Sequence, residues 1–566
     1  MGFINDLRKD FYDVIDHQRV LILVGFDVDA LAACKILLHL FQCDHVPYTV
    51  VPVSGREDLE SAYQENSEGV KYVVMLNCGG NFDVIELLQP EDKVLFYICD
   101  SHRPIDVFNA YNAVQVKMLV EEREAGDDLP EYDQVFRDDE SDEDDSGNES
   151  EGSEPSGKKR RFNPEALEKR RNRRLWEEKR TNILFEYEQY SKYGKSAALT
   201  MYQMAWKMSK DTNDLLWLAI LGVTDQFINF KVDRDVYMSY IDELQHHVSR
   251  HNHRGDDVES TISVNCLRIT YEEELQLTLY RHWSLFESLC HSPYLACKFR
   301  VWTMKGRKKL HEFLADMGLP LVQCQQKWTA MDVNFKDEIS SMILDKMEKY
   351  GFDKQYVFLP SFHASYGYKN KVCATDVVLA CSSVLESIDR DASMTDSFLS
   401  ALDVLTRANV EAKEKCLGLA KMQTKAIVSQ VQSFLDMNQI VSAGPFLYAF
   451  IQPGTLDVKF FSKAICLQRL AHYTLEAYAS VCKSKKNRAL PLVLGAPLDA
   501  ELGTTIIIGI PPILDESRRS FFGKAFEQAG EMTNSRMLLD SFDSHIIQIK
   551  SEDKSKFFDA LIGVLQ

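Results

Sequence analysis

Two aspartates stand directly behind an apolar run in the stretch VLILVGFDVDALAACK, residues 20–35. Because a helix-like pattern begins at once after them, we expect Asp27 and Asp29 to lie where a buried strand meets a helix. Other apolar runs of the chain also end on polar side chains. The residues that follow such runs are Asp27, Asp29, Asn77, Asp100, His102 and Asp225.

These side chains are of the types that hold divalent cations. In doubly wound parallel sheets, ligands bind outside the carboxyl ends of the strands, so we expect these residues to share one crevice. Oxygen and imidazole ligands suit Mg²⁺ or Mn²⁺, and a pair of such ions would activate water for attack on a phosphodiester. An aspartate in front of a helix is also a common N-cap. Spacing alone leaves both interpretations open.

The surrounding pattern predicts the sheet that these residues need. From about residue 19 to 120, short β-rich runs alternate with helical periodicity, which is typical of a doubly wound, mostly parallel α/β sheet. A helical pattern follows, and then the runs FLYAFIQP, VKFFS, PLVLGAPL and TTIIIGIPP predict strands. We therefore predict an α/β domain at 1–230, a helical interdomain segment at 231–395 and a smaller C-terminal α/β domain at 396–566.

Composition restricts the classes of function. The 566 residues carry a formal net charge of -20, which argues against non-specific coating of duplex nucleic acid. The 13 cysteines include no C-x-x-C pair, so neither a zinc ribbon nor a disulfide framework is indicated. No uncharged run approaches the length that spans a bilayer, and the first residues lack a secretory pattern. We expect a soluble intracellular protein without a membrane partner.

Two charged segments interrupt the first domain. Residues 138–161 are rich in Asp, Glu and Ser and predict a disordered acidic loop, which either only solvates the surface or also accepts phosphate. Asn163 and Pro164 then predict a charged helix over about 164–190. The nearby basic residues have the spacing of a two-part nuclear import signal, or line a solvated helix; they are Lys158, Lys159, Arg160, Arg161, Lys169, Arg170 and Arg171.

Local basic clusters are the candidates for nucleic-acid binding. Arg518, Arg519 and Lys524 flank Phe521 and Phe522, and single-strand binding joins a basic groove to stacking rings. The alternative is that the rings face the core while the arginines face water. A second cluster lies in a predicted loop of the last domain and consists of Lys483, Lys485, Lys486 and Arg488.

The stretch HHVSRHNHR places His247 and His251 one helical turn apart, a spacing that would suit Zn²⁺ or Ni²⁺. The glutamate of a zinc-protease motif is absent, and the residues that follow are polar and typical of a loop. We therefore predict no metal at these histidines.

The polar strand ends also carry a family resemblance. In this order, GFDVDALAA, LNCGG, CDSHRP and LGVTDQF resemble the motifs of the DHH phosphoesterases, the family of the RecJ single-strand exonuclease. From the first residues to the last, FQCDH, VPVSG, HVSRHNHR, EFLADMGLPL, GPFLY and SKFFDALI resemble the cell division cycle protein 45 family. The resemblance implies a DHH domain, a helical interdomain insertion and a C-terminal domain related to the DHH-associated domain.

The resemblance also implies which catalytic groups are missing. Active DHH enzymes have acids at the positions of Gly25 and Asn77 and a histidine at that of Ser101. The matching positions that remain are Asp27, Asp29, Asp100, His102 and Asp225. Because a two-ion site depends on summed negative charge, the neutral amide of Asn77 is the most damaging change. We therefore expect an inactivated phosphoesterase without a catalytic residue, metal or cofactor.

The implied function is that of a non-enzymatic subunit of the eukaryotic replicative helicase, located in the nucleus and required for initiation and elongation of DNA replication. The implied partners are the minichromosome-maintenance hexamer, the GINS complex, replication-initiation factors, the replicative polymerase and single-stranded DNA. By the same resemblance, the strand is expected between the two α/β domains. The alternative is an active metal-dependent single-strand exonuclease or phosphoesterase of the RecJ type.

Overall fold

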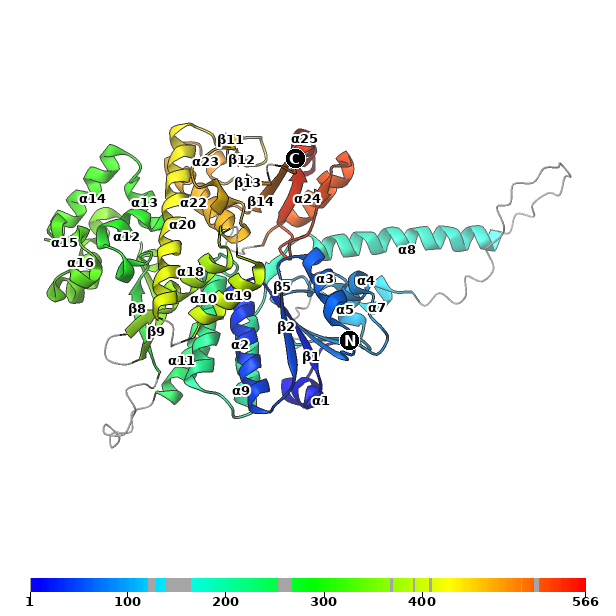
Figure 1. The fold of residues 1–566 in the computed structure, drawn as a ribbon. Coiled ribbons are helices and arrows are strands. Elements are labelled where there is room, and N and C mark those ends of the chain that lie inside the picture. Colours follow the sequence, from blue (N-terminus) through cyan, green and yellow to red (C-terminus); the bar gives the residue numbers. More distant parts are fainter. Residues whose placement is uncertain are drawn as a thin grey trace.

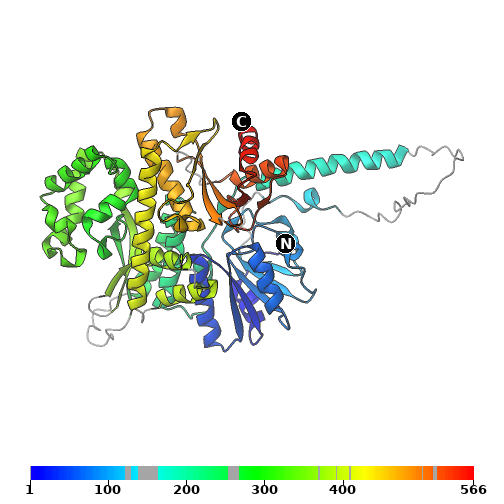
Figure 2. The ribbon, with the colours of Figure 1, turned by 45° about the horizontal axis from the view of Figure 1, so that its top comes forward.

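The computed structural model places two α/β units beside a large helical region, and Figure 1 and Figure 2 show this arrangement from two directions. No described helix is both long and apolar enough to cross a membrane. The structure describes residues 2–120, 129–137, 164–252, 267–366, 370–389, 392–406, 410–499, 501–513 and 519–566.

Five strands form the parallel sheet of the N-terminal unit, in the order β2-β1-β3-β4-β6. They are short runs rich in Val, Ile and Leu, which suit a sheet that is buried on both faces. Neighbouring strands all pair in parallel, and Val20 lies opposite both Tyr48 and Tyr72. The strands are β1 (Val20–Gly25), β2 (Tyr48–Val53), β3 (Tyr72–Leu76), β4 (Leu95–Cys99) and β6 (Val116–Met118).

Alternate residues of β1 face two different helical layers. Val20, Ile22 and Val24 pack into one core, whereas Leu21 and Leu23 pack into another. This arrangement confirms the predicted doubly wound fold class. The run LAILGVTDQF lies inside a helix rather than at a strand end. The first layer contains α2 (Val28–Cys43), α9 (Ala197–Lys207) and α10 (Asn213–Ile228); the second contains α3 (Arg56–Asn66), α4 (Val84–Leu88) and α5 (Val107–Tyr111).

Helix α8 (Pro164–Glu188) extends away from the body of the molecule in both ribbon views, Figure 1 and Figure 2. It begins at Pro164, as predicted. Its last turn returns to the body, where the Tyr187 hydroxyl donates a hydrogen bond to the Ile105 carbonyl at 2.9 Å. Arg171 is exposed. Outside the described part lie the predicted acidic loop at 138–161, Asn163, Lys158, Lys159, Arg160 and Arg161, and the side chains of Lys169 and Arg170.

The middle of the chain is mostly helical, as predicted, but it also contains an antiparallel sheet. Strand β9 (Phe358–Tyr366) pairs with both β8 (Arg268–Leu275) and β10 (Asn370–Cys373). The β8 run RITYEEEL has few apolar residues, so its strand period is weak in the sequence. The longer helices here are α11 (Arg234–His251), α14 (Met304–Asp316), α16 (Val333–Tyr350) and α18 (Ala374–Leu385). Two further helices, α19 (Met394–Val404) and α20 (Val410–Asp436), continue into the segment predicted as the C-terminal domain.

The C-terminal unit is a six-stranded mixed sheet in the order β11-β12-β13-β14-β16-β15. Helix α22 packs on one face, and α24 and α25 pack on the other. One strand prediction is wrong: the VKFFS run forms helix α21 (Val458–Phe461), because so short an apolar run does not reveal its period. The other elements are β11 (Val441–Ser442), β12 (Leu447–Phe450), α22 (Ala464–Val481), α23 (Lys485–Arg488), β13 (Leu492–Asp499), β14 (Thr504–Ile510), α24 (Phe522–Thr533), β15 (Met537–Leu538), β16 (Ile546–Lys550) and α25 (Lys554–Leu565).

Candidate functional site

Asp27 and Asp29 lie at the junction of β1 and α2, as the sequence predicts. Asp27 is the N-cap of α2 and accepts a hydrogen bond from the Ala30 backbone N–H at 2.7 Å, so the capping interpretation of this residue is confirmed. Asp29 is fully buried, and its carboxylate accepts the backbone N–H groups of Ala197 (2.9 Å) and Ala198 (3.0 Å) at the start of α9. Burial raises the pKa of Asp29, and its bonds tie α2 to α9.

Asn77 bridges the two aspartates from the end of β3. Its backbone has a φ of 50°, a left-handed conformation that Asn tolerates better than most residues. The amide Nδ2 donates to Asp27 Oδ1 at 3.2 Å and to Asp29 Oδ2 at 3.0 Å. Its Oδ1 accepts the Ser101 backbone N–H at 3.1 Å. The neutral amide therefore donates hydrogen bonds to both carboxylates. It adds no negative charge that could help to bind a cation.

Lys231 supplies a positive charge that the sequence motifs do not contain. Its Nζ lies 3.0 Å from Asp27 Oδ2 and 5.3 Å from the centre of the Tyr193 ring, and the side chain is 6% exposed. Burial alone would lower the pKa of this ammonium, but the surrounding carboxylates raise it above its ordinary value. Phe230, with a φ of 59°, makes the turn after α10 that directs the lysine back into the crevice. The crevice thus contains a cation of the chain itself.

Asp225 reaches the same crevice from within α10. One carboxylate oxygen accepts the Asn229 amide at 2.8 Å, whereas the other is buried and has no hydrogen-bond partner among the described residues. Burial raises the pKa of Asp225 to about 7, although the nearby Lys231 acts in the opposite direction. Asp225 is therefore an incompletely paired carboxyl group.

Asp100 and His102 form a second charged pair behind β4. Asp100 Oδ1 lies 2.6 Å from His102 Nδ1, and its Oδ2 accepts the Gly80 backbone N–H at 2.7 Å. On the other side of the ring, His102 Nε2 lies 3.2 Å from Asp543 Oδ1 in the C-terminal unit. Burial alone would lower the pKa of His102, but the carboxylates of Asp100 and Asp543 raise it to about 10. The imidazole is therefore positively charged at neutral pH.

The C-terminal unit closes onto this crevice through the loop 540–545. The Phe542 and Phe82 rings stack at 6.3 Å, and Asn81 Nδ2 donates to the Phe542 carbonyl at 2.7 Å. At the start of α3, the Glu57 backbone N–H donates to Asp540 Oδ1 at 3.0 Å. The edge between the two α/β units, where the resemblance implies a bound strand, is therefore bridged here by the chain itself.

The residues present do not fit a pair of divalent ions. Asn77 and Lys231 direct N–H groups at carboxylates that metal ions would need as ligands. An acidic side chain at position 25 is also disfavoured, because a Cβ on Gly25 would lie 2.7 Å from the Asn77 carbonyl oxygen. Ser101 contributes only its backbone N–H to Asn77. The arrangement can hold charge and join elements, but it lacks the acidic ligands for two-metal hydrolysis.

The two predicted basic clusters differ in how far their side chains are accessible. Lys483, Lys485, Lys486 and Arg488 are exposed, on and beside α23 rather than in a loop. Arg519 is exposed, and Arg518 lies outside the described residues. Phe522 is fully buried, which bears out the core-facing alternative for this ring. Lys524 is paired with Glu188 of α8 at 2.6 Å. The α23 cluster is thus the more accessible of the two.

The predicted absence of a metal at the α11 histidines remains untested, but the two side chains have separate partners. The His247 ring lies 5.1 Å from the rings of Tyr202 and Trp206. His251 Nε2 instead lies 2.7 Å from Asp211 Oδ2. Their contacts attach α11 to its neighbours.

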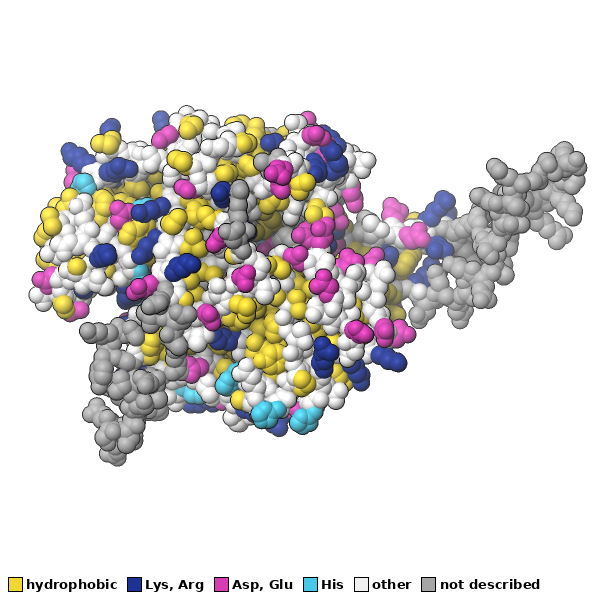
Figure 3. All heavy atoms as spheres, in the orientation of Figure 1, with side chains coloured by type: hydrophobic (Ala, Val, Ile, Leu, Met, Phe, Trp, Pro, Cys, Tyr) yellow, Lys and Arg dark blue, Asp and Glu magenta, His cyan; other side chains and the backbone are white. Residues whose placement is uncertain are grey.

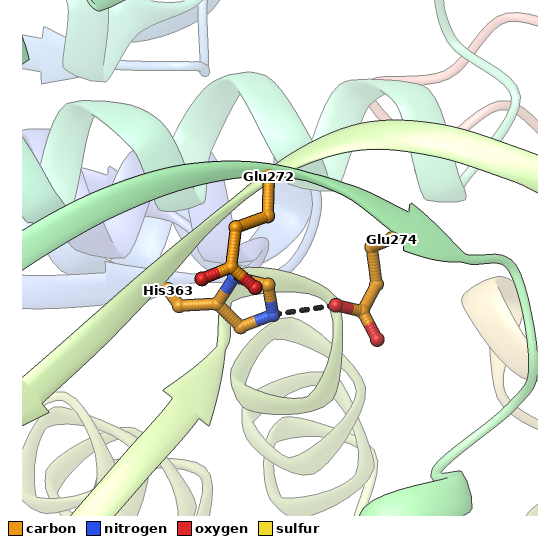
Figure 4. A group of neighbouring side chains, drawn as sticks. All are labelled: Glu272, Glu274 and His363. Atoms are coloured by element: carbon orange, nitrogen blue, oxygen red, sulfur yellow. Dashed lines mark ion pairs between the residues drawn. The ribbon is translucent and has the colours of Figure 1, made fainter. Parts of the chain in front are cut away.

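A second group with metal-like ligands lies on β8 and β9, and the sequence analysis missed it (Figure 4). His363 is fully buried, and its Nε2 lies 2.7 Å from Glu274 Oε2. Arg281 donates to both oxygens of Glu274, at 2.6 and 3.0 Å, and Lys371 donates to Glu272 at 2.8 Å. The spacing of the two glutamates, two residues apart on one strand, was the available signal. Because Arg281 and Lys371 already balance them, this group is an ion-pair cluster.

A cavity of about 1130 Å³ lies between the helical middle and the C-terminal unit. Its lining mixes charges of both signs with aromatic rings and includes Arg234, Glu274, Tyr280, Lys298 and Tyr473. A wall of mixed charge does not select a ligand of one sign, so the cavity defines no substrate class.

The fold and the crevice define a class of protein: a doubly wound α/β domain joined to a mixed-sheet domain, with strand-end carboxylates between them. Within this class, the CDC45 family model matches residues 20–154 and 119–563. The chain belongs to the CDC45 family.

Curated relatives and a solved structure agree with this assignment. The chain is 48% identical over 569 residues to the Cell division control protein 45 homolog of Homo sapiens, and the match covers 100% of both chains. It is 24% identical to Cell division control protein 45 of Saccharomyces cerevisiae, with 96% of this chain and 95% of the relative covered. The crystal structure of CDC45 from Entamoeba histolytica matches with a TM-score of 0.70 at 24% identity, covering 100% of this chain and 99% of the other. This match confirms the fold.

Proposed function

We propose that the protein is a non-enzymatic subunit of the eukaryotic replicative helicase and acts in initiation and elongation of DNA replication. The observation that carries the proposal is the crevice, where Asn77 and Lys231 present N–H groups to carboxylates that a catalytic metal pair would need. Membership of the CDC45 family, with curated relatives named for control of cell division, supports a role in replication.

In this proposal the protein braces the minichromosome-maintenance hexamer together with the GINS complex. The loop 540–545 bonds the C-terminal unit to Glu57 of α3, to Asn81 and to His102, so the two α/β units act as one stiff body. The helical middle and the projecting helix α8 (Figure 1) supply further surface for replication-initiation factors and the replicative polymerase. Nuclear import through the basic residues of α8 belongs to the same proposal.

Single-stranded DNA is the proposed nucleic-acid ligand, and the exposed α23 cluster is the preferred contact. On the face drawn in Figure 3, Lys and Arg side chains are interspersed with Asp and Glu. Mixed charge of this kind favours local contacts to the DNA backbone over a continuous basic track. We expect such binding to weaken as salt rises, and substitution of Lys485 and Lys486 by glutamate to weaken it without disturbing the crevice.

A nuclease assay tests the non-enzymatic part of the proposal. Purified full-length protein is incubated with end-labelled single-stranded DNA and Mn²⁺, beside an Asp27→Ala, Asp100→Ala double variant. We expect no release of mononucleotides by either protein. Release by the unmodified chain but not by the variant would establish the RecJ-type exonuclease instead.

A reconstitution assay tests the assembly. The full-length chain is mixed with the minichromosome-maintenance hexamer and GINS, and complex formation is followed by size-exclusion chromatography and by unwinding of a forked DNA. We expect unwinding to require this chain, and the α23 variant to enter the complex normally. A hexamer that unwinds equally well without the chain would contradict the proposed function.

A further inference from the structure

The turn that follows α10 lies between the crevice and the C-terminal unit. It consists of Asn229, Phe230 and Lys231, directly after the last residue of α10. Backbone bonds tie it to that helix: the Phe230 N–H donates to the Phe227 carbonyl at 3.1 Å, and the Lys231 N–H donates to the Gln226 carbonyl at 2.8 Å. Phe230 has a φ of 59°, a left-handed conformation that a bulky residue keeps only where its surroundings hold it. The side-chain contacts of the turn are therefore part of what fixes it.

Helix α22 of the C-terminal unit makes side-chain contacts to the first two residues of the turn. Gln468 Nε2 donates a hydrogen bond to the Asn229 carbonyl, and Arg469 Nε donates one to Asn229 Oδ1, both at 2.9 Å. One helical turn further along, the His472 ring stacks on the Phe230 ring, with the ring centres 4.0 Å apart. Asn229 and Gln468 are buried, so little water competes for these bonds. The C-terminal unit thus helps to hold the turn in place.

Helix α22 depends on α18 of the helical middle, and α10, α18 and α22 lie close together in Figure 1. Glu386, the C-cap residue of α18, accepts the backbone N–H groups of Ile465 at 2.6 Å and Cys466 at 2.9 Å at the start of α22. Because the N-cap residue of α22 makes no capping side-chain bond, Glu386 caps this helix from another one. Arg469 Nη2 also donates to Ser382 Oγ of α18 at 3.2 Å. The turn, α18 and α22 therefore form one bonded junction.

The junction borders the large cavity, which leaves room for movement. Phe230 and Arg469 both line this cavity of about 1130 Å³. Side chains beside a void lack packing partners on one side, so a displacement there meets less resistance than in a close-packed core. The contacts between α22 and the turn are therefore a place where the C-terminal unit can shift relative to α10.

Lys231 carries such a displacement into the crevice. Its backbone follows Phe230 directly, and its Nζ lies 3.0 Å from Asp27 Oδ2. The lysine side chain is only 6% exposed, and the attraction within a buried ion pair depends on a short contact. A turn that moves away with α22 therefore draws the ammonium away from Asp27.

We propose that the turn 229–231 is a conformational coupler: it keeps Lys231 in contact with Asp27 while α22 is docked, and it releases the ammonium when α22 moves away. The structure represents the docked state. In the undocked state, Lys231 is exposed to solvent and Asp27 has lost this contact. Gln468 and Arg469 are positioning residues that act on the lysine through the turn. The inference concerns movement of the chain alone and holds whether or not the protein is a helicase subunit.

The test measures how fast each lysine of the full-length protein is acetylated by N-hydroxysuccinimidyl acetate, with peptide mass spectrometry as the readout. The test variant combines Gln468→Leu with Arg469→Met, which keeps the size of both side chains but removes their bonds to the turn. The matched control is Arg536→Met, because Arg536 lies in the same unit and pairs with Asp553 instead. The loss of two hydrogen bonds of ordinary strength should raise the acetylation rate of Lys231 about tenfold in the test variant. The control should match wild type.

Lys35 shows whether the chain has loosened in general. Its ammonium donates to the Leu402 carbonyl at 2.9 Å, in a contact between α2 and α19. We expect its acetylation rate to stay at the wild-type value. An equal rise at Lys35 and Lys231 would overturn the proposal, because it would show general loosening instead of a coupled movement. An unchanged rate at Lys231 in the folded test variant, or an equal rise in the control, would overturn it as well.

Should circular dichroism show that the double variant does not fold, His472→Leu decides. This change removes the ring that stacks on Phe230 and leaves both bonds to Asn229 in place. We expect a selective rise of about threefold in the acetylation rate of Lys231, in keeping with the strength of one ring contact. A folded His472→Leu protein with the wild-type rate at Lys231 would refute the coupling.

Discussion

Two clusters of carboxylates in this molecule have the ligand types of metal sites, and the chain neutralises them differently. On β8, the two carboxylate oxygens of Glu274 accept hydrogen bonds from the Nη1 and Nη2 atoms of Arg281, at 2.6 and 3.0 Å. In the crevice, Lys231 contacts Asp27 at 3.0 Å, while Asp225 keeps one buried oxygen without a partner among the described residues. Both glutamates of the first cluster bond to cations, whereas Asp225 in the second has no hydrogen-bonded cation among the described residues.

The difference appears in the pKa values. Burial alone would raise the pKa of Glu274, but bonds from His363 and Arg281 lower it to about 2. Burial dominates at Asp225 and raises its pKa to about 7. A cluster of acidic ligands therefore indicates a metal site only when the cations that the chain itself contributes have been counted.

The largest expected effect is at Lys231, the cation that contacts Asp27 in the crevice. Lys231→Met removes the ammonium that contacts Asp27, and removing one partner of a buried ion pair costs about 3–5 kcal/mol. Urea unfolding at neutral pH measures the loss of unfolding free energy. The control is Lys371→Met at the β8 cluster, where both partners are more than a third exposed and the cost should stay below about 1 kcal/mol. Equal losses in the two variants would erase the contrast between the clusters.

The β8 cluster should show a stabilising carboxylate. Because the folded-state pKa of Glu274 lies at about 2, below its ordinary value of 4.5, its charge contributes about 3 kcal/mol that is fully present above pH 4.5 and lost as pH falls towards 2. Glu274→Gln should therefore be less stable than wild type at about pH 6, and the gap should narrow in acid. A gap that stays constant with pH would contradict the pairing described here.

At Asp225 in the crevice, the dependence of stability on pH should have the opposite sign. Its folded-state pKa is raised from 3.8 to about 7, so ionisation opposes folding as pH rises between these values, and the whole penalty is present above pH 7. Asp225→Asn should thus gain stability relative to wild type as the buffer is changed from about pH 4 to pH 8. Thermal melting of both proteins across this range measures the gain, and a relative loss at high pH would refute it.

A smaller effect is expected at Gly25, where the packed backbone leaves little room for a side chain. A Cβ would lie 2.7 Å from the Asn77 carbonyl oxygen and 3.1 Å from that of Leu76, and inserting an atom into packed backbone costs about 1–3 kcal/mol. Gly25→Ala should unfold at lower urea concentration, and Gly418→Ala, with open space at its Cβ position, is the control. If Gly25→Ala unfolded at the same urea concentration as wild type, the end of β1 would be able to move and make room for a side chain.

Much of the crevice could be predicted from the sequence because Asp27, Asp29, Asp100 and Asp225 each stand at the end of an apolar run. Asp27, Asp29 and Asp100 lie near each other for the reason expected, since the carboxyl ends of parallel strands meet at one edge. Asp225 lies inside helix α10 and not at the end of a strand, but its side chain reaches the same crevice. The parallel sheet was predictable because short β-rich runs alternate with segments of helical periodicity.

The residues that decide the chemistry were not predictable in this way. Lys231 is 204 residues from Asp27, and Asp543 is 441 residues from His102. Neither belongs to a periodic run or a spaced motif, so only the folded chain brings them to the crevice. The strands β8, β9 and β10 were missed because an acidic run such as RITYEEEL lacks the apolar alternation that marks a strand.

The most direct test is crystallographic. Crystals of the full-length chain are soaked in millimolar MnCl₂, and anomalous diffraction is recorded at the manganese edge. We predict no anomalous peak among Asp27, Asp225 and Asp543, with the Lys231 ammonium still in contact with Asp27. A manganese peak bound to these carboxylates, with Lys231 displaced, would contradict the conclusion that the chain's own cation occupies the crevice.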